Sequence, residues 1–204
     1  MVQLVLASTS PYRRELLSRL GLPFEQAKPT VDETPAPGEL PQALSLRLAK
    51  AKATALALQY PGAWLIGSDQ VAVCKGRLMG KPGTPEAALA QLQWQRGSHT
   101  SFHTTVCLYR PSDNESQVQM VTTNVHWLAE ADLSDAQLRR YIELESPLDC
   151  AGAAKSERLG TVLIQKMETP DPTALIGLPM VALTQMLRQW GLDPLGTPGA
   201  SASG

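Results

Sequence analysis

Residues 2–20, VQLVLASTSPYRRELLSRL, are the stretch that decides the fold. Residues 2–7 form a short apolar run, which is typical of a buried strand. Ser10 can cap a helix in which Pro11 takes the first position, where its missing N–H costs nothing. Three leucines then recur on one face of that helix. A buried strand that turns directly into an amphipathic helix predicts an α/β protein.

The rest of the chain continues this alternation of short strands and helices. Two long strands flank a polar turn at residues 111–116, which predicts a hairpin that a purely parallel sheet would not need. We therefore expect a mixed sheet with flanking helices. The other expected strands are 24–27, 64–73, 98–109, 117–128 and 160–164, and the expected helices are 11–20, 41–60, 84–94, 134–145 and 179–190.

Composition narrows the class of partner. The chain has 204 residues with 18 basic and 19 acidic side chains, so it lacks the basic excess that binding to nucleic acid usually requires. Three widely spaced cysteines predict neither a disulfide framework nor a structural zinc site. The start of the chain does not resemble a signal peptide, and no apolar run is long enough to span a bilayer. We expect a cytoplasmic protein with no nucleic-acid or membrane partner.

The turn between the first strand and helix is the first candidate site. A helix N-terminus offers free N–H groups and a positive partial charge, both of which suit phosphate. Ser8 and Ser10 add hydroxyls, and helical spacing directs Arg13 to the inward face. An inward arginine beside such a turn can clamp phosphate. The structural alternative is a capped helix whose arginine stem covers apolar surface.

Acidic residues mark a second candidate site. Asp69 follows a buried strand, where it can hold a hard cation or orient a water molecule, although a turn aspartate is an equal alternative. Asp32 and Glu33 lie in a loop, and such residues are most often simply solvated. Lys81 lies in a Gly-Lys-Pro-Gly loop and either meets a triphosphate or stays exposed.

Two further segments carry charge in positions that need explaining. On the helix at 41–60, Arg47 falls within the apolar stripe and Lys52 at its edge, so covering apolar surface is the favoured role for both. Residues 149–157 form a loop of small residues that contains Lys155 and Glu157. A glutamate there can accept two hydrogen bonds from the edge of guanine.

Together these motifs resemble the Maf family of nucleotide pyrophosphatases, over about residues 4–195. Their order and spacing along the chain make the resemblance specific. The matching segments are LASTSPYRRELL (6–17), VDET (31–34), RLAKAKA (47–53), GSDQ (67–70), GKP (80–82), CAGAAKSE (150–157) and IGLP (176–179).

The resemblance implies a fold shared with inosine-triphosphate pyrophosphatases, an elongated mixed sheet in two lobes around a cleft. It implies one domain over residues 1–194 and a homodimer. Residues 195–204 are Gly, Ser, Pro, Thr, Leu and Ala, a composition that predicts a disordered tail.

The resemblance also implies roles for individual residues. Asp69 is expected to accept a proton in catalysis, with Glu33 as its acidic partner. These two carboxylates are expected to hold a divalent metal cation, Mg²⁺ or Mn²⁺. The expected phosphate-facing residues are Ser8, Arg13, Lys52, Lys81 and Lys155.

Three positions indicate the subfamily that hydrolyses 7-methyl-GTP to 7-methyl-GMP and pyrophosphate, which clears modified nucleotides. These are Tyr12, Gln70 and Glu157, where relatives acting on dTTP and UTP carry other residues. Methylation at N7 makes the purine cationic, and an aromatic ring can stack on such a cation. The alternatives are a dTTP/UTP pyrophosphatase of the same family and a non-catalytic nucleotide-binding regulator of cell division.

Overall fold

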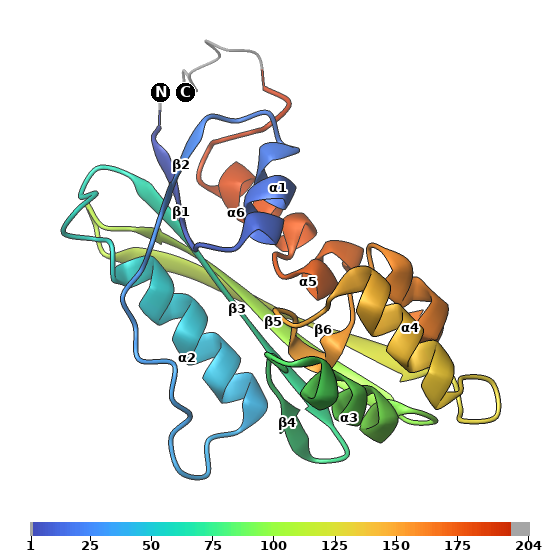
Figure 1. Cartoon of the computed structure of the whole chain (residues 1–204). Helices are drawn as coiled ribbons and strands as arrows, with labels where there is room; N and C mark the ends of the chain where they lie inside the picture. The colour runs from blue at the N-terminus through green and yellow to red at the C-terminus, as the bar shows by residue number, and fades with distance from the viewer. Residues whose placement is uncertain (1, 197–204) are drawn as a thin grey trace.

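The computed structural model describes residues 2–196, so residues 197–204 of the expected tail lie outside it. The strands form one seven-stranded sheet in the order β2-β1-β3-β5-β6-β7, with β4 paired to β3. Figure 1 shows the sheet running the length of the molecule. The strands are β1 (Leu4–Ala7), β2 (Phe24–Ala27), β3 (Trp64–Cys74), β4 (Arg77–Met79), β5 (His99–Arg110), β6 (Glu115–Trp127) and β7 (Ile164–Glu168).

Helices flank this sheet, and two short 3₁₀ helices lie in the loops. Strand β1 is parallel to both β2 and β3, whereas the remaining strand pairs are antiparallel. The expected mixed sheet and α/β class are therefore confirmed. The helices are α1 (Pro11–Ser18), α2 (Pro41–Thr54), α3 (Pro85–Gln95), α4 (Asp135–Glu145), α5 (Pro172–Ile176) and α6 (Met180–Gln189), with 3₁₀ turns η1 (Ala151–Ala153) and η2 (Leu159–Leu163).

The two faces of the sheet are covered differently. Successive side chains of a strand point to opposite faces, and in β1 Leu4 and Leu6 pack against α1 and α6 while Val5 and Ala7 pack against α2. The same alternation in β3 directs its even-numbered residues toward the α1 and α6 face. Helix α2 runs along the opposite face and follows β3 past the end of β1.

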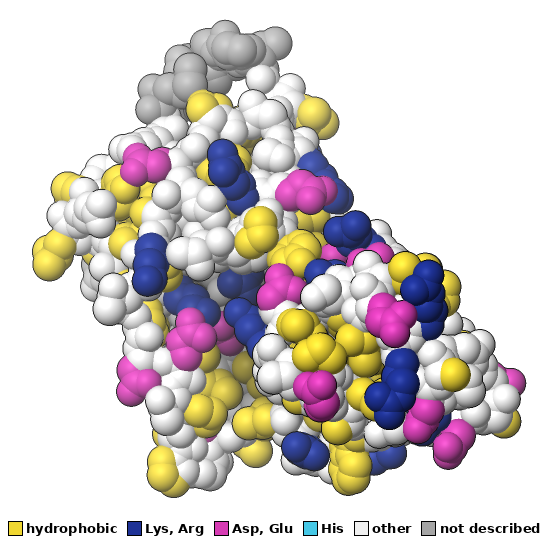
Figure 2. All heavy atoms as spheres, viewed as in Figure 1, with side chains coloured by type: hydrophobic (Ala, Val, Ile, Leu, Met, Phe, Trp, Pro, Cys, Tyr) yellow, Lys and Arg dark blue, Asp and Glu magenta, His cyan; other side chains and the backbone are white. Residues whose placement is uncertain are grey.

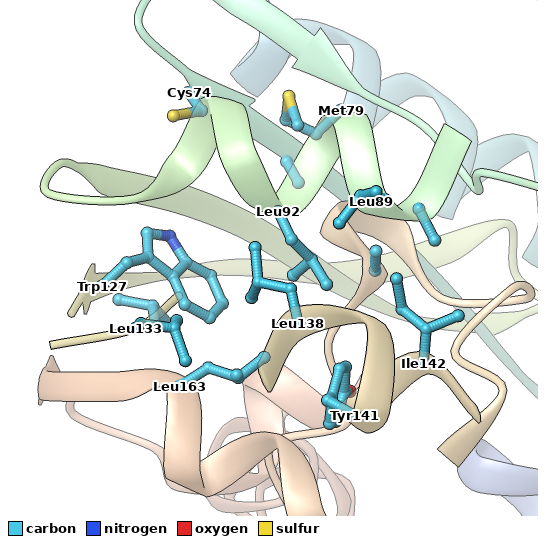
Figure 3. Packing of buried hydrophobic residues seen from close by; sticks show 14 of the residues in the cluster. Cys74, Met79, Leu89, Leu92, Trp127, Leu133, Leu138, Tyr141, Ile142 and Leu163 are labelled. Carbon is cyan, nitrogen blue, oxygen red and sulfur yellow. The ribbon is translucent and has the colours of Figure 1, made fainter. Parts of the chain in front are cut away.

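A second apolar cluster fills the other end of the first face. Helices α3 and α4 pack there against Cys74, Phe102 and Trp127. Figure 3 shows Leu92 and Leu138 pointing toward one another from the two helices, with Trp127 of the sheet beside them. The α1/α6 and α3/α4 groups lie near opposite ends of the sheet, and Figure 1 shows α5 between them.

Gly67 brings α2 unusually close to β3. A Cβ atom at this position would lie 2.3 Å from the main-chain oxygen of Ala49 and 2.6 Å from the nitrogen of Ala53. Only glycine leaves room for this approach, and the next turn of α2 therefore lies directly on β3. This packing sets the distance between side chains of α2 and the residues that follow Gly67.

Some expected elements differ in extent. The predicted strand at 160–164 is wrong over most of its length, because residues 159–163 form η2 and β7 begins only at Ile164. The Gly160 N–H donates to the main-chain oxygen of Lys155 at 3.1 Å, a local turn bond that an extended strand cannot make. Helix α2 ends at Thr54 rather than near residue 60. Strand β4 and helix α5 were not predicted, since both are too short for periodicity to reveal.

Across residues 2–196, no helix has both the length and the hydropathy needed to cross a bilayer.

Candidate active site

A gap in strand pairing opens the sheet at the middle of β3. Strand β1 ends at Ala7, opposite Gly67, and β4 pairs with β3 only from Ala72 onward. Within the described part of the chain, residues 68–71 of β3 therefore pair with β5 alone. The N-terminus of α1 follows β1 across this gap, so residues from both faces can reach the same space.

A cleft of about 420 Å³ lies at this gap. Figure 2 shows basic and acidic side chains crowded together in the middle of the face, between more apolar regions. The structure brings together all of the predicted site residues except Lys155, which does not line the cleft. The predicted residues along its walls are Ser8, Tyr12, Arg13, Glu33, Lys52, Asp69, Gln70, Lys81 and Glu157.

Lys52 is the centre of the charged group. Its Nζ lies 2.7 Å from Asp69 Oδ1 and 2.8 Å from Glu33 Oε1, so one ammonium bridges both carboxylates. The side chains of Lys52 and Asp69 are buried, whereas Glu33 is 61% exposed. One ammonium group therefore contacts a buried carboxylate on one side and a solvent-exposed carboxylate on the other.

These environments shift the pKa values of the two carboxyl groups in opposite directions. Burial raises the pKa of Asp69 above its ordinary value, and the charge of Glu33 adds to this although Lys52 and Arg13 oppose it. Burial also works to raise the pKa of Glu33, but the hydrogen bond and charge of Lys52 outweigh it, so the pKa of Glu33 is lowered. A buried carboxylate with a raised pKa is suited to accept a proton.

Arg13 closes the cleft beside Asp69. Its Nε donates to the main-chain oxygen of Gly177 at 2.8 Å, and its Nη1 lies 3.4 Å from Ser8 Oγ. Ser68 Oγ donates to the same Gly177 oxygen at 2.8 Å. Gly177 has a φ of 124°, a backbone conformation that favours glycine. The loop after α5 thus holds the guanidinium in place while its unused N–H groups remain available to an anion.

The residues predicted to select the base occupy a different part of the wall. Tyr12 donates its hydroxyl to Asp149 Oδ2 at 3.1 Å. The Gln70 amide Nε2 donates to Thr104 Oγ1 and to two main-chain oxygens of α5, so its nitrogen is already used inside the protein. Glu157 is exposed at the cleft.

The two outer lysines are placed differently. Lys81 is exposed on the loop after β4 and lines the cleft. Lys155 is buried, and its Nζ donates to the main-chain oxygens of Glu145 and Ser146 at 3.0 and 3.3 Å. Its ammonium therefore satisfies the carbonyl end of α4 instead of facing the cleft.

Two features escaped the sequence reasoning. The helical periodicity misplaced Arg47 and Lys52 on α2, although the family resemblance had pointed to Lys52: Lys52 is buried in the site, and Arg47 lies outside, hydrogen-bonded to Glu39. The periodicity of α2 is blurred by alanines, so the stripe could not be located to within one residue. Asp149 also lines the cleft, and nothing in its loop sequence distinguished it.

The cleft suits a divalent cation only in part. No cluster of three or more His, Cys, Asp or Glu side chains with metal-binding geometry occurs among residues 2–196. Glu33 and Asp69 nevertheless direct oxygen atoms at a single cation, the Lys52 ammonium, and oxygen ligands are what Mg²⁺ prefers. Mg²⁺ commonly takes one or two protein carboxylates and completes its shell with water and substrate phosphates.

A cleft that places basic side chains at a helix N-terminus, beside one buried carboxylate with a raised pKa, is typical of an α/β protein that binds and acts on a small phosphorylated ligand. The chain belongs to the Maf family, since a family model described as "Maf-like protein" matches residues 3–190. The resemblance inferred from the motifs is thereby confirmed.

Curated relatives match nearly the whole chain. One from Ralstonia nicotianae is 54% identical over 91% of this chain and 94% of its own length, and one from Cupriavidus metallidurans is 51% identical over 95% and 96%. A third, from Burkholderia thailandensis, is 50% identical over 99% and 94%. All three are named 7-methyl-GTP pyrophosphatase. A solved dITP/XTP pyrophosphatase from Mycobacterium abscessus aligns with 62% of this chain and 73% of its own at 19% identity, with a TM-score of 0.38.

Proposed function

We propose that this protein is a hydrolase that cleaves 7-methyl-GTP into 7-methyl-GMP and pyrophosphate. The observation that carries the proposal is the Lys52 bridge between Glu33 and Asp69, in a cleft that Arg13 also lines. Relatives about 50% identical over most of the chain bear that activity in their names.

The triphosphate would lie along the cationic side of the cleft. Arg13, Lys52 and Lys81 contribute positive side chains there, and α1 begins at the same place. Ser10 Oγ already accepts from the Arg13 N–H, so it caps the helix, while Ser8 Oγ accepts from the Ser10 N–H. Charge that develops on a leaving pyrophosphate is stabilised best by cations fixed in advance, as Arg13 is by Gly177.

Asp69 would take the proton from the water that attacks the α-phosphorus. Its raised pKa brings its basicity closer to neutral pH, which makes proton transfer more efficient than it would be with an ordinary aspartate. Lys52 keeps this carboxylate ionised despite its burial, since its charge and hydrogen bond oppose the effect of desolvation.

Glu33 and Asp69 would hold a divalent cation, Mg²⁺ or Mn²⁺, together with water and phosphate oxygens. When bound, such a cation polarises the phosphate and lowers the pKa of the attacking water. Pyrophosphate release measured with and without Mg²⁺ or Mn²⁺ tests this part of the proposal. We expect a chelator to abolish activity and added metal to restore it, and full activity in the presence of the chelator would contradict the metal site.

The base would lie near Tyr12 and Glu157 at the opposite side. The Tyr12 ring offers a stacking surface for a cationic purine, and Glu157 offers a carboxylate to the guanine edge. Gln70 acts indirectly, because its amide nitrogen holds α5 against β5.

A substrate panel tests the proposal directly. Pyrophosphate release is measured with 7-methyl-GTP, GTP, dTTP, UTP and CTP, and we expect the highest kcat/KM for 7-methyl-GTP. A preference for dTTP or UTP would transfer the protein to the pyrimidine branch of the family, and release from none of them would contradict catalysis altogether. The predicted homodimer is tested by light scattering on the same preparation.

A further inference from the structure

A second group of contacts in the cleft centres on Asp149. Its Oδ2 accepts the Tyr12 hydroxyl at 3.1 Å, and Tyr12 comes from α1, 137 residues earlier in the chain. Its Oδ1 lies 3.6 Å from Lys155 Nζ. Tyr12 and Asp149 both line the cleft. The carboxylate therefore joins the helix that follows β1 to the loop that follows α4.

The loop that carries Asp149 is fixed from several sides. Lys155 Nζ donates to the last carbonyls of α4, and the Lys155 main-chain N–H donates to Tyr141 Oη at 3.0 Å. The buried Gln95 donates from Nε2 to the main-chain oxygen of Gly152 at 2.8 Å. Because the loop is held on the C-terminal side of Asp149 and at α4, the carboxylate occupies a defined place although its side chain is 56% exposed.

The Asp149 carboxylate has the Lys155 ammonium, 3.6 Å away, as its nearby cation. Burial works to raise the pKa of Asp149, but the charge of Lys155 and the Tyr12 hydrogen bond outweigh it and lower that pKa below the ordinary value. The neighbouring Cys150 thiol is neutral, since burial and the charge of Asp149 raise its pKa to about 12. The Lys155 charge is shared with the carbonyl end of α4. Negative charge therefore remains at this wall, to which Glu157 adds.

We propose that Asp149 is a specificity-determining residue that favours a nucleobase with a positive charge, such as an N7-methylated purine, over its neutral counterpart. This inference rests on the proposed function and adds to it a residue with no role so far. At this wall a neutral purine gains stacking on the Tyr12 ring and hydrogen bonds to Glu157. A cationic purine gains in addition from the carboxylate bonded to that ring's hydroxyl.

The variant Asp149→Asn tests the inference, because an amide oxygen can still accept the Tyr12 hydroxyl while the charge is lost. The measured quantity is the ratio of kcat/KM for 7-methyl-GTP to kcat/KM for GTP. We expect this ratio to fall about three- to tenfold, since a partly exposed charge pair has a modest effect. The loss should lie in KM for 7-methyl-GTP, and inhibition by 7-methyl-GMP should weaken relative to inhibition by GMP.

Two further variants separate the charge from other effects. Asp132→Asn makes the same change of net charge on an exposed residue outside the cleft, and we expect it to leave the ratio unchanged. Tyr12→Phe removes the hydroxyl but keeps the ring and the Asp149 charge. We expect it to alter both substrates together and to leave the ratio within about twofold of the parent value.

Each outcome has one meaning. A ratio that falls in Asp149→Asn alone supports the inference. An unchanged ratio in Asp149→Asn overturns it, and so does an equal fall in Tyr12→Phe, which would assign selectivity to the position of the ring. If the parent enzyme itself shows no preference for 7-methyl-GTP over GTP, the proposed function fails, and this is seen before any variant is compared.

Discussion

The two groups of charged residues in the cleft are built by different means. The Lys52 group lies mainly on regular structure, with Lys52 in α2 and Asp69 in β3, and Gly67 sets how closely α2 and β3 approach. The Asp149 group lies in loops, where Ser146 and Gly152 have positive φ angles of 44° and 74°. Sheet register and helix packing position the first group. Individual side-chain hydrogen bonds position the second. We therefore expect substitutions in the two groups to have different effects on activity and stability.

The largest effect should come from removing the buried carboxylate of the first group. We expect Asp69→Asn to lower kcat by about a thousandfold or more, because an amide cannot accept the proton from the attacking water. Pyrophosphate release measures the loss, and circular dichroism checks that the variant is folded. Asp113→Asn, in the β5–β6 turn, is the matched control. A variant with near-parent turnover would remove Asp69 from its proposed role.

The next effect concerns the close approach that positions Lys52. We expect Gly67→Ala to lower the free energy of unfolding by about 3 kcal/mol, because the new methyl group would overlap the α2 main chain. Gly62→Ala is the control, since a Cβ there meets no atom within 4 Å. Urea unfolding compares the two. Equal stabilities would mean that α2 can shift away from β3, and activity would then report how far Lys52 moves with it.

The third effect probes the loop group through Gln95. Besides holding the Gly152 carbonyl, its Oε1 accepts from Thr100, whose Oγ1 in turn accepts from the Trp127 indole N–H. We expect Gln95→Leu to cost about 2 kcal/mol of unfolding free energy, because buried polar groups lose their partners. It should raise KM several-fold while kcat stays close to the parent value. The exposed Gln42→Leu is the control, and a fall in kcat instead of a rise in KM would contradict the division between the two groups.

The same division explains what could be predicted from the sequence. Strand β1, its turn and α1 follow from apolar periodicity and the Ser10 cap, and the helix expected over 134–145 is present as α4. The convergence of Asp69 and Lys52 does not follow, because it depends on the register of β3 against β1 and on the space left by Gly67. Family resemblance, and not periodicity, pointed to Lys52.

The positions of loop residues were still harder to predict from the sequence. The backbone near Lys155 is held by side chains from α3 and α4, at distant places in the chain, so local sequence could not show that Lys155 turns toward α4. Asp149 likewise gains its place only when Tyr12 comes near it in three dimensions.

The smallest effect concerns the loop that carries Glu33. An ion pair between Glu39 of this loop and Arg47 of α2 makes the effect dependent on pH. Glu39 accepts two hydrogen bonds from Arg47, at 2.7 and 2.8 Å, and one from the Ala36 N–H, which together lower its pKa to about 2. Arg47 also donates to the main-chain oxygen of Thr34, so it ties down the segment beside Glu33. Arg47 is exposed, so salt should screen its charge, and the effect on stability is expected to be slight.

The sign of this pH dependence follows from the lowered pKa. The folded protein binds the Glu39 proton more weakly than the unfolded chain does, so the pair stabilises the fold above pH 4.5 and ceases to do so as the pH falls toward 2. In Arg47→Gln, an NMR titration should find the Glu39 pKa closer to 4.5, with KM raised less than twofold. Arg19→Gln, which breaks an exposed pair in α1, should leave the Glu39 pKa near 2. If Glu39 still titrated near 2 without Arg47, the hydrogen bond from the Ala36 N–H would be enough to lower its pKa. That result would contradict the role of Arg47 in positioning the segment beside Glu33.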